Sequence, residues 1–242
     1  MTRIKVAAFL TALLCGCAAA ASSALAGDLR FEASSGLCGY GMSEKGSWWN
    51  DHYETNIDRR GACWQIGLSQ TPWKWGRYDL GWRAAYVRFP KLTTNSVMAA
   101  RDEDQFNHPN GDGCVAETRE NCTIRTKGGG RVQGLSVGPI VERRIGRATL
   151  GAEVGLFFYH NEFDVQVRPG PGNPGAFQPY QWNHAEGWRR KPYVGVNARY
   201  DWLFLAGRAY HQLDAKGECD MCSGATGGTA WQWTAGISVP LD

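Results

Sequence analysis

The chain has 242 residues, of which 43% are hydrophobic and 20% are charged, and its formal net charge at pH 7 is +3. This length fits a single domain. A nearly neutral chain lacks the positive field with which proteins bind nucleic-acid phosphates, so we expect no nucleic-acid partner.

The first residues have the features of an export signal. Two basic residues precede an apolar stretch at about 6–20, and small residues at 24–26 fit a signal-peptidase site. The stretch is shorter than the ~20 residues that a membrane-spanning helix needs. We predict a cleaved signal peptide over 1–26 and one domain over 27–242. A lipoprotein signal ending at Cys17 is the alternative.

The remaining chain contains eight segments with the pattern of β-strands. Apolar residues alternate with polar or small ones at a period of two, and many segments approach the ~10 residues of a tilted transmembrane strand. The alternation is clearest from Trp231 to Leu241, where the odd positions are apolar. In chain order the predicted strands cover about 29–38, 62–69, 78–89, 131–142, 148–167, 192–200, 203–213 and 231–241.

Two of these segments change the face that carries their apolar residues. In 78–89 the change predicts a β-bulge near 84–85, after which Val87 and Phe89 would point outward. A similar change near Asn161 would turn the later apolar side chains of its strand outward.

The predicted connections alternate between short and long. The short ones cover 71–76, 143–146 and 201–202, and the long ones cover roughly 40–61, 90–130, 168–190 and 214–229. Outer-membrane barrels combine short periplasmic turns with longer extracellular loops. The sequence therefore predicts an all-β fold, an eight-stranded antiparallel up-and-down transmembrane β-barrel in the cell outer membrane. A soluble exported β-protein is the alternative.

The inward positions of the predicted strands carry four acids and four arginines. These are Arg30, Glu32, Asp79, Arg83, Glu142, Glu153, Arg199 and Arg208. Charges in a narrow interior must be paired, and an eight-stranded barrel has room only for side chains. We predict a lumen plugged by a charge network rather than a general pore. The alternative is that these charges lie on the solvent face of an open sheet.

Six cysteines follow the signal, and an even number in an exported chain is typical of disulfides. Many connectivities are possible, and proximity along the chain favours Cys38–Cys63, Cys114–Cys122 and Cys219–Cys222. The last pair also has CxxC spacing, which can bind a metal or support redox chemistry. We expect a local disulfide there.

Aromatic residues gather at both ends of the predicted strands, as in the girdles that flank the apolar band of membrane barrels. The group at the short turns is Trp73, Trp75, Tyr78, Tyr200 and Trp202. The group toward the long loops is Phe89, Phe158, Phe163, Trp188, Trp231 and Trp233.

The last strand also matches the C-terminal signal by which barrel proteins are assembled, at Thr234, Gly236, Val239 and Leu241. Together with the strand pattern, this signal makes the chain resemble small eight-stranded outer-membrane barrels of the OmpX/Ail and opacity-protein type. The resemblance covers the mature chain and lies in its architecture. It implies recognition by the outer-membrane assembly machinery. Many members end in an aromatic residue, whereas this chain ends in Asp242.

Candidate catalytic groups are few. His160 and His211 are predicted to face outward near the loop end, and neither has a serine at the spacing of a lipid A deacylase. We expect interfacial histidines, no cofactor and no metal site; the acidic second loop fits no EF-hand.

The leading hypothesis is a surface barrel without enzymatic activity. Its four long loops would contact outer-membrane lipid and lipopolysaccharide, or a host or phage surface ligand, because loops on a rigid scaffold often carry recognition. The alternative is an enzyme that modifies lipid A, as an acyl hydrolase or acyltransferase, with a site at the outer rim.

Overall fold

The structure is a computed structural model that describes residues 29–41, 55–58, 60–99, 123–170, 178–185, 187–213 and 228–241. No helix in this part of the chain is long and apolar enough to cross a membrane.

The described residues form ten strands, and each strand pairs antiparallel with its neighbours. They are β1 (Arg30–Gly39), β2 (Thr55–Asp58), β3 (Arg60–Trp75), β4 (Tyr78–Ala99), β5 (Thr123–Ile145), β6 (Ala148–Pro169), β7 (Tyr180–Ala185), β8 (Arg189–Tyr200), β9 (Leu203–Tyr210) and β10 (Ala230–Pro240).

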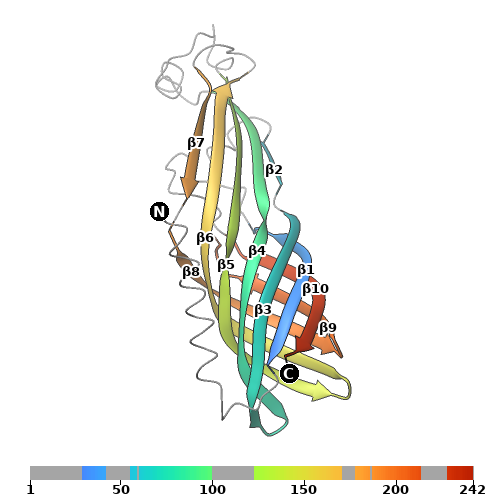
Figure 1. Cartoon of the computed structure of the whole chain (residues 1–242). Coiled ribbons are helices and arrows are strands. Elements are labelled where there is room, and N and C mark those ends of the chain that lie inside the picture. The colour runs from blue at the N-terminus through green and yellow to red at the C-terminus, as the bar shows by residue number, and fades with distance from the viewer. Residues whose placement is uncertain are drawn as a thin grey trace.

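Eight of the strands close into a ring. The order around it is β4-β3-β1-β10-β9-β8-β6-β5, and β5 pairs back with β4. The first and last strands meet along their whole length, from Arg30 opposite Pro240 to Gly39 opposite Trp231 (Figure 1). The predicted eight-stranded up-and-down barrel is confirmed.

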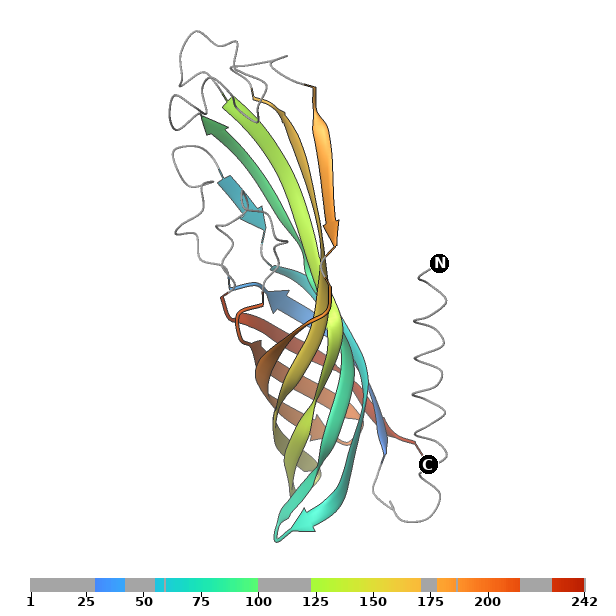
Figure 2. The same cartoon turned by 90° about the vertical axis from the view of Figure 1, so that its left-hand side faces the viewer.

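Three strands continue beyond the ring at the end opposite the short turns. There β4, β5 and β6 form a projecting sheet to which β2 and β7 add at the two edges, and Figure 2 shows this sheet rising above the barrel. The predicted loops 40–61, 90–130 and 168–190 were therefore wrong in part, since each contains strand residues. Most strand residues within these ranges are polar or glycine, so they lack the apolar alternation by which the ring strands were predicted.

Tight turns connect the strands at the other end. Gly76 and Gly146 adopt positive φ angles of 61° and 63°, and Asp201 adopts 52°, as two-residue hairpin turns require. The predicted turns at 71–76 and 143–146 were too long, because β3 and β5 each continue to the residue before the turn glycine.

The predicted bulge near 84–85 is wrong. Burial along β4 alternates without a break from Gly81 to Phe89, and Val87 and Phe89 are 0% and 1% exposed. The register shift lies further along, between Arg88 and Lys91. Pro90 lies within it and has no N–H for the ladder, so the pairing is interrupted there.

The predicted change of face near Asn161 is also wrong. The β5–β6 register runs from Ile124 opposite Pro169 to Val137 opposite Leu156 without a shift, and Asn161 is buried. The inward positions of β6 therefore stay odd-numbered on both sides of this residue.

Candidate functional site in the lumen and at the rim

Arg83 lies at the centre of a buried group of charges inside the barrel. Its Nε is 2.9 Å from Glu32 Oε2, its Nη1 is 3.1 Å from Glu153 Oε2, and its Nη2 is 3.7 Å from Glu142 Oε1. The guanidinium contacts three carboxylates because β1, β5 and β6 all turn an acid into the same lumen. The guanidinium carbon Cζ also lies 5.1 Å from the ring centre of Phe204, a residue near the turn between β8 and β9.

Two further arginines balance the charge of the three acids. Arg208 Nε lies 2.6 Å from Glu153 Oε1, and its Nη1 donates a hydrogen bond to Gln65. Arg199 Nη2 lies 3.1 Å from Glu142 Oε2. The group thus holds three acids and three arginines from six strands of the ring. Such pairing offsets the large cost of removing each charge from water.

Two of the predicted inward charges, Arg30 and Asp79, are not members of this group. Arg30, at the start of β1, donates to Ser238 Oγ at 3.0 Å and to its carbonyl oxygen at 2.9 Å. Asp79, near the start of β4, is half-buried opposite Glu142 on the neighbouring strand. Within the described residues, no ion pair joins Asp79 to an arginine or lysine.

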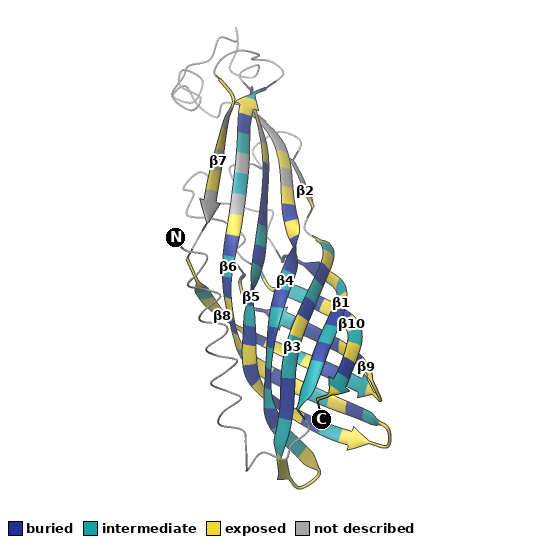
Figure 3. Cartoon of the chain, viewed as in Figure 1, coloured by how far each residue is buried: buried dark blue, intermediate teal, exposed yellow. Residues whose placement is uncertain are grey.

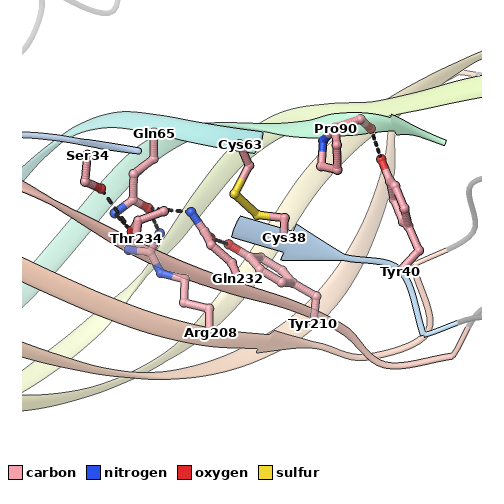
Figure 4. Close-up of a disulfide and its surroundings, with 10 residues drawn as sticks. All are labelled: Ser34, Cys38, Tyr40, Cys63, Gln65, Pro90, Arg208, Tyr210, Gln232 and Thr234. Atoms are coloured by element: carbon pink, nitrogen blue, oxygen red, sulfur yellow. Dashed lines mark hydrogen bonds between the residues drawn. A yellow bond between two sulfur atoms is a disulfide. The ribbon is translucent and has the colours of Figure 1, made fainter. Parts of the chain in front are cut away.

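Neutral polar side chains extend the network around the ring. Gln232 Nε2 donates to Gln65 Oε1 at 3.2 Å, and Tyr210 Oη donates to Gln232 Oε1 at 2.6 Å. Figure 4 shows these groups with the nearby hydrogen bond from Ser34 to Thr234. We did not single out the glutamines from the sequence, although their inward strand positions were a signal that pointed to them.

An aromatic layer lies on the loop side of the charges. It consists of Tyr40, Phe89, Phe157, Tyr159, Tyr193 and Tyr210, each at most 4% exposed. Ring centres are 5.0 Å apart for Phe157–Tyr210, 5.3 Å for Phe89–Tyr210 and 5.5 Å for Tyr40–Phe89. This layer was not predicted from the sequence, because Phe89 was assigned to the outer surface.

Tyr40 follows the first strand and reaches the register shift between β4 and β5. Its hydroxyl donates to the Pro90 carbonyl oxygen at 2.8 Å and accepts from the Val132 amide at 3.3 Å (Figure 4). It therefore satisfies two backbone groups close to the point where the β4–β5 ladder is interrupted.

A disulfide joins β1 and β3 at the same level. Cys38 and Cys63 form it, with Cα atoms 5.7 Å apart and both residues buried. This was one of the predicted pairings. Cys114, Cys122, Cys219 and Cys222 lie outside the described residues.

The outer surface of the ring is apolar, the reverse of a soluble protein. Figure 3 shows exposed positions alternating with buried ones along the ring strands. The exposed aliphatic residues are Leu37, Ile66, Val137, Val141, Ile145, Leu150, Val154, Leu156, Val194, Val196, Leu203, Leu205, Ile237 and Leu241.

Exposed aromatic side chains border this surface at both ends. All five residues of the predicted group at the turns are exposed: Trp73, Trp75, Tyr78, Tyr200 and Trp202. At the loop end Phe158, Trp188 and Trp233 are exposed, whereas Phe89 is inside the barrel.

The assembly-signal residues divide between the two faces of β10. Thr234 and Gly236 lie on the inward positions, where the Thr234 hydroxyl accepts a hydrogen bond from Ser34 at 3.0 Å. Val239 and Leu241 lie on the opposite parity, and Leu241 is 49% exposed.

The rim histidines have no catalytic partner in the described part of the chain. His160 Nε2 lies 3.0 Å from Gln133 Nε2, and its ring centre is 5.0 Å from that of Trp188. The backbone amide of His211 donates a hydrogen bond to the Pro192 carbonyl oxygen at 3.0 Å. Within the described residues, no three His, Cys, Asp or Glu side chains gather to form a metal site.

No family model matches the sequence, and no curated protein matches it significantly. Among solved structures, the chain is similar in fold to Ail, the attachment invasion locus protein of Yersinia pestis, solved in complex with the heparin analogue sucrose octasulfate. The identity is 10%, the TM-score is 0.40, and the match covers 88% of this chain and 99% of that chain. The barrel assignment itself rests on the strand pairing described above.

Proposed function

We propose that the chain is an outer-membrane β-barrel with a role in surface interaction rather than catalysis. The observation that carries this proposal is the reversed polarity of the closed ring: aliphatic side chains outside and paired charges inside. A closed barrel satisfies every backbone hydrogen bond between strands, which a lipid environment requires. An apolar outer surface of this size would make a soluble monomer aggregate.

Residues 1–26 serve as the export signal in this proposal, and 27–242 form the mature barrel. The turns that follow β3, β5 and β8 would face the periplasm, and the projecting sheet would face the outside. Outer-membrane barrels are oriented in this way, with the short turns on the periplasmic side.

The lumen is plugged in this proposal. The charged group and the aromatic layer succeed one another along the barrel axis, and the interior of an eight-stranded barrel is just wide enough for side chains to fill it. Recognition would then fall to the projecting sheet and to the rest of the segments 40–61, 90–130, 168–190 and 214–229, with lipopolysaccharide or a host or phage ligand as the partner.

Fractionation of the native host tests membrane insertion. The protein should be found in the outer membrane and should migrate differently on a gel before and after boiling, because a closed barrel resists detergent unfolding. Recovery in the soluble periplasmic fraction, with no mobility change, would refute the proposal.

Catalysis on lipid A requires a separate measurement. His160 contacts a glutamine and a tryptophan, which supply neither a nucleophile nor an acid for general acid–base chemistry. Mass spectra of lipid A from cells with and without the protein should therefore be identical. A changed acyl number would establish enzymatic activity and contradict the non-enzymatic role.

A further inference from the structure

The disulfide between Cys38 and Cys63 lies on the lumen side of the ring. The two residues are 0% and 2% exposed, and their sulfur atoms form a covalent bond between β1 and β3 (Figure 4). In the β1–β3 register a glycine lies opposite each cysteine, at Gly61 and Gly36. The bond therefore joins the two strands diagonally on their inward faces.

The residues that bury this bond come from the whole length of the chain. The cysteines belong to one buried cluster, to which β4, β5, β6, β8, β9 and β10 all contribute. Figure 4 shows the bond together with Tyr210 and Gln232, which come from β9 and β10. Because these are the last two strands, the cluster is incomplete until they take their places in the ring. The strand residues that the cluster adds to the cysteines are Val87, Phe89, Leu92, Val132, Phe157, Tyr159, Tyr193, Tyr210 and Ala230.

A sulfur atom must be accessible for its redox state to change. In thiol–disulfide exchange a thiolate attacks a sulfur atom of an existing disulfide, and the two partners are joined by a mixed disulfide on the way. The interior of an eight-stranded barrel is just wide enough for its own side chains. The active site of a protein oxidant therefore cannot enter the closed ring, whereas the inward faces of an open sheet are accessible to it.

We propose that a periplasmic protein with an exchangeable disulfide oxidises Cys38 and Cys63 before the ring closes, and that closure then buries the finished bond. The inference rests on the proposed export and barrel closure. One cysteine thiolate attacks the oxidant's disulfide and forms a mixed disulfide, and the second thiolate then attacks the sulfur of the first. The bond between the cysteines forms, two electrons pass to the oxidant, and its two sulfurs leave as a dithiol that takes up the two protons.

Thiol accessibility in the full-length mature barrel tests this order of events. A variant in which serine replaces the four other cysteines of the mature chain, C114S/C122S/C219S/C222S, keeps only the pair that forms the bond. It is folded in detergent under reducing conditions, freed of reductant and mixed with a thioredoxin-fold dithiol oxidase in its disulfide form. Free thiols are then counted over time by alkylation with a polyethylene-glycol maleimide after denaturation.

The folded barrel should lose its thiols at least about a hundredfold more slowly than the unfolded chain, since openings of a packed interior are rarely populated. The unfolded sample is the same variant, kept in urea at a concentration that the oxidase tolerates. Equal rates for the two samples would overturn the proposal, because the bond could then form after closure.

An exposed cysteine pair is the matched control. D58C/T93C, in a mature chain whose native cysteines are all serine, places two thiols opposite each other on β2 and β4 at exposed positions. The folded control should lose its thiols about as fast as it does in urea. A folded barrel whose Cys38 and Cys63 react as fast as this control would refute burial as the barrier.

The reverse reaction decides if the reduced variant does not fold. The four-serine variant is then folded with its disulfide intact and treated with a reduced thioredoxin. The folded barrel should keep the bond at least about a hundredfold longer than the unfolded chain does. Equal rates of reduction would count against the proposal in the same way.

Pulse-labelled cells of the native host show the order directly. Chains are trapped with an alkylating reagent, and the gel mobility of the unboiled sample separates folded from unfolded chains. Unfolded chains should already contain the bond between Cys38 and Cys63. Folded chains that hold free thiols and become oxidised later would refute the proposed order alone, whereas a protein that stays soluble and never acquires the folded mobility refutes the proposed function.

Discussion

Arg208 and Arg147 both form ion pairs, in opposite surroundings. Arg208 and its partner Glu153 are 0% exposed at their side chains, whereas Arg147 and its partner Asp201 are 70% and 39% exposed. Water already solvates the second pair and weakens its attraction. In the lumen the partner left behind by a substitution would be a buried carboxylate with reduced compensation.

R208A should therefore destabilise the barrel by about 3–5 kcal/mol. R147A should cost less than about 1 kcal/mol. Urea unfolding in lipid vesicles, followed by the gel mobility of the folded form, measures both. Equal urea midpoints of unfolding for R208A and R147A would mean that the lumen is hydrated enough to solvate Glu153.

Gly195 leaves room for the ion pair between Arg208 and Glu153. A Cβ atom at this position would lie 2.7 Å from Glu153 Oε1 and 2.9 Å from Arg208 Cγ, closer than real Cβ contacts. At Gly187 an added Cβ would meet nothing within 4 Å.

G195A should accordingly cost about 1–3 kcal/mol by overpacking. G187A should be close to neutral, and the same unfolding assay compares the two. A G195A barrel as stable as the wild type would show that the pair can move aside without loss.

At the scale of the strand, Tyr40 compensates for an irregularity in β4, two strands away from β1 around the ring. Its hydroxyl bonds Pro90 and Val132 across the lumen, while its ring packs against Phe89. The hydroxyl and the ring can be tested separately, because a phenylalanine at position 40 keeps the ring contact with Phe89 and removes the hydroxyl.

Y40F should lower the free energy of unfolding by about 1–3 kcal/mol, since it leaves a buried carbonyl and a buried amide without their partner. Y78F, at an exposed tyrosine near the turns, is the control and should have little effect. Amide hydrogen exchange of Val132 gives an independent readout and should accelerate in Y40F alone. Unchanged exchange there would contradict the proposed role of the hydroxyl.

The ring strands could be predicted because one face of each strand points out of the barrel and the other points into the lumen. Alternation identified all eight, and parity placed Glu32, Arg83 and Glu153 inside. Val87 and Phe89 were assigned to the wrong face, because an apolar side chain suits both a lipid-facing surface and an aromatic interior. Only the packing of the lumen distinguishes the two faces. The strand residues at 90–99, 123–130 and 180–185 show little apolar alternation, and the hydrogen bonds between strands have no compositional signal by which they could be predicted.

For the whole molecule, the proposed plug would determine what can cross the barrel. Charges, glutamines and aromatic rings occupy successive levels, and the interior of an eight-stranded barrel is just wide enough for side chains to fill it. The purified protein in planar bilayers should therefore show no steady ionic conductance, and vesicles that contain it should not swell in sugar solutions. A stable open channel in salt solution would contradict a plugged interior.

The seam between β1 and β10 also has a consequence during biosynthesis. The ring cannot close until the last strand has been made, because Arg30 pairs with Pro240. Before that moment β1 and β9 each have an unpaired edge, and unpaired edges of apolar strands promote aggregation. A chain without β10 should therefore aggregate, because β1 and β9 would both keep an open edge.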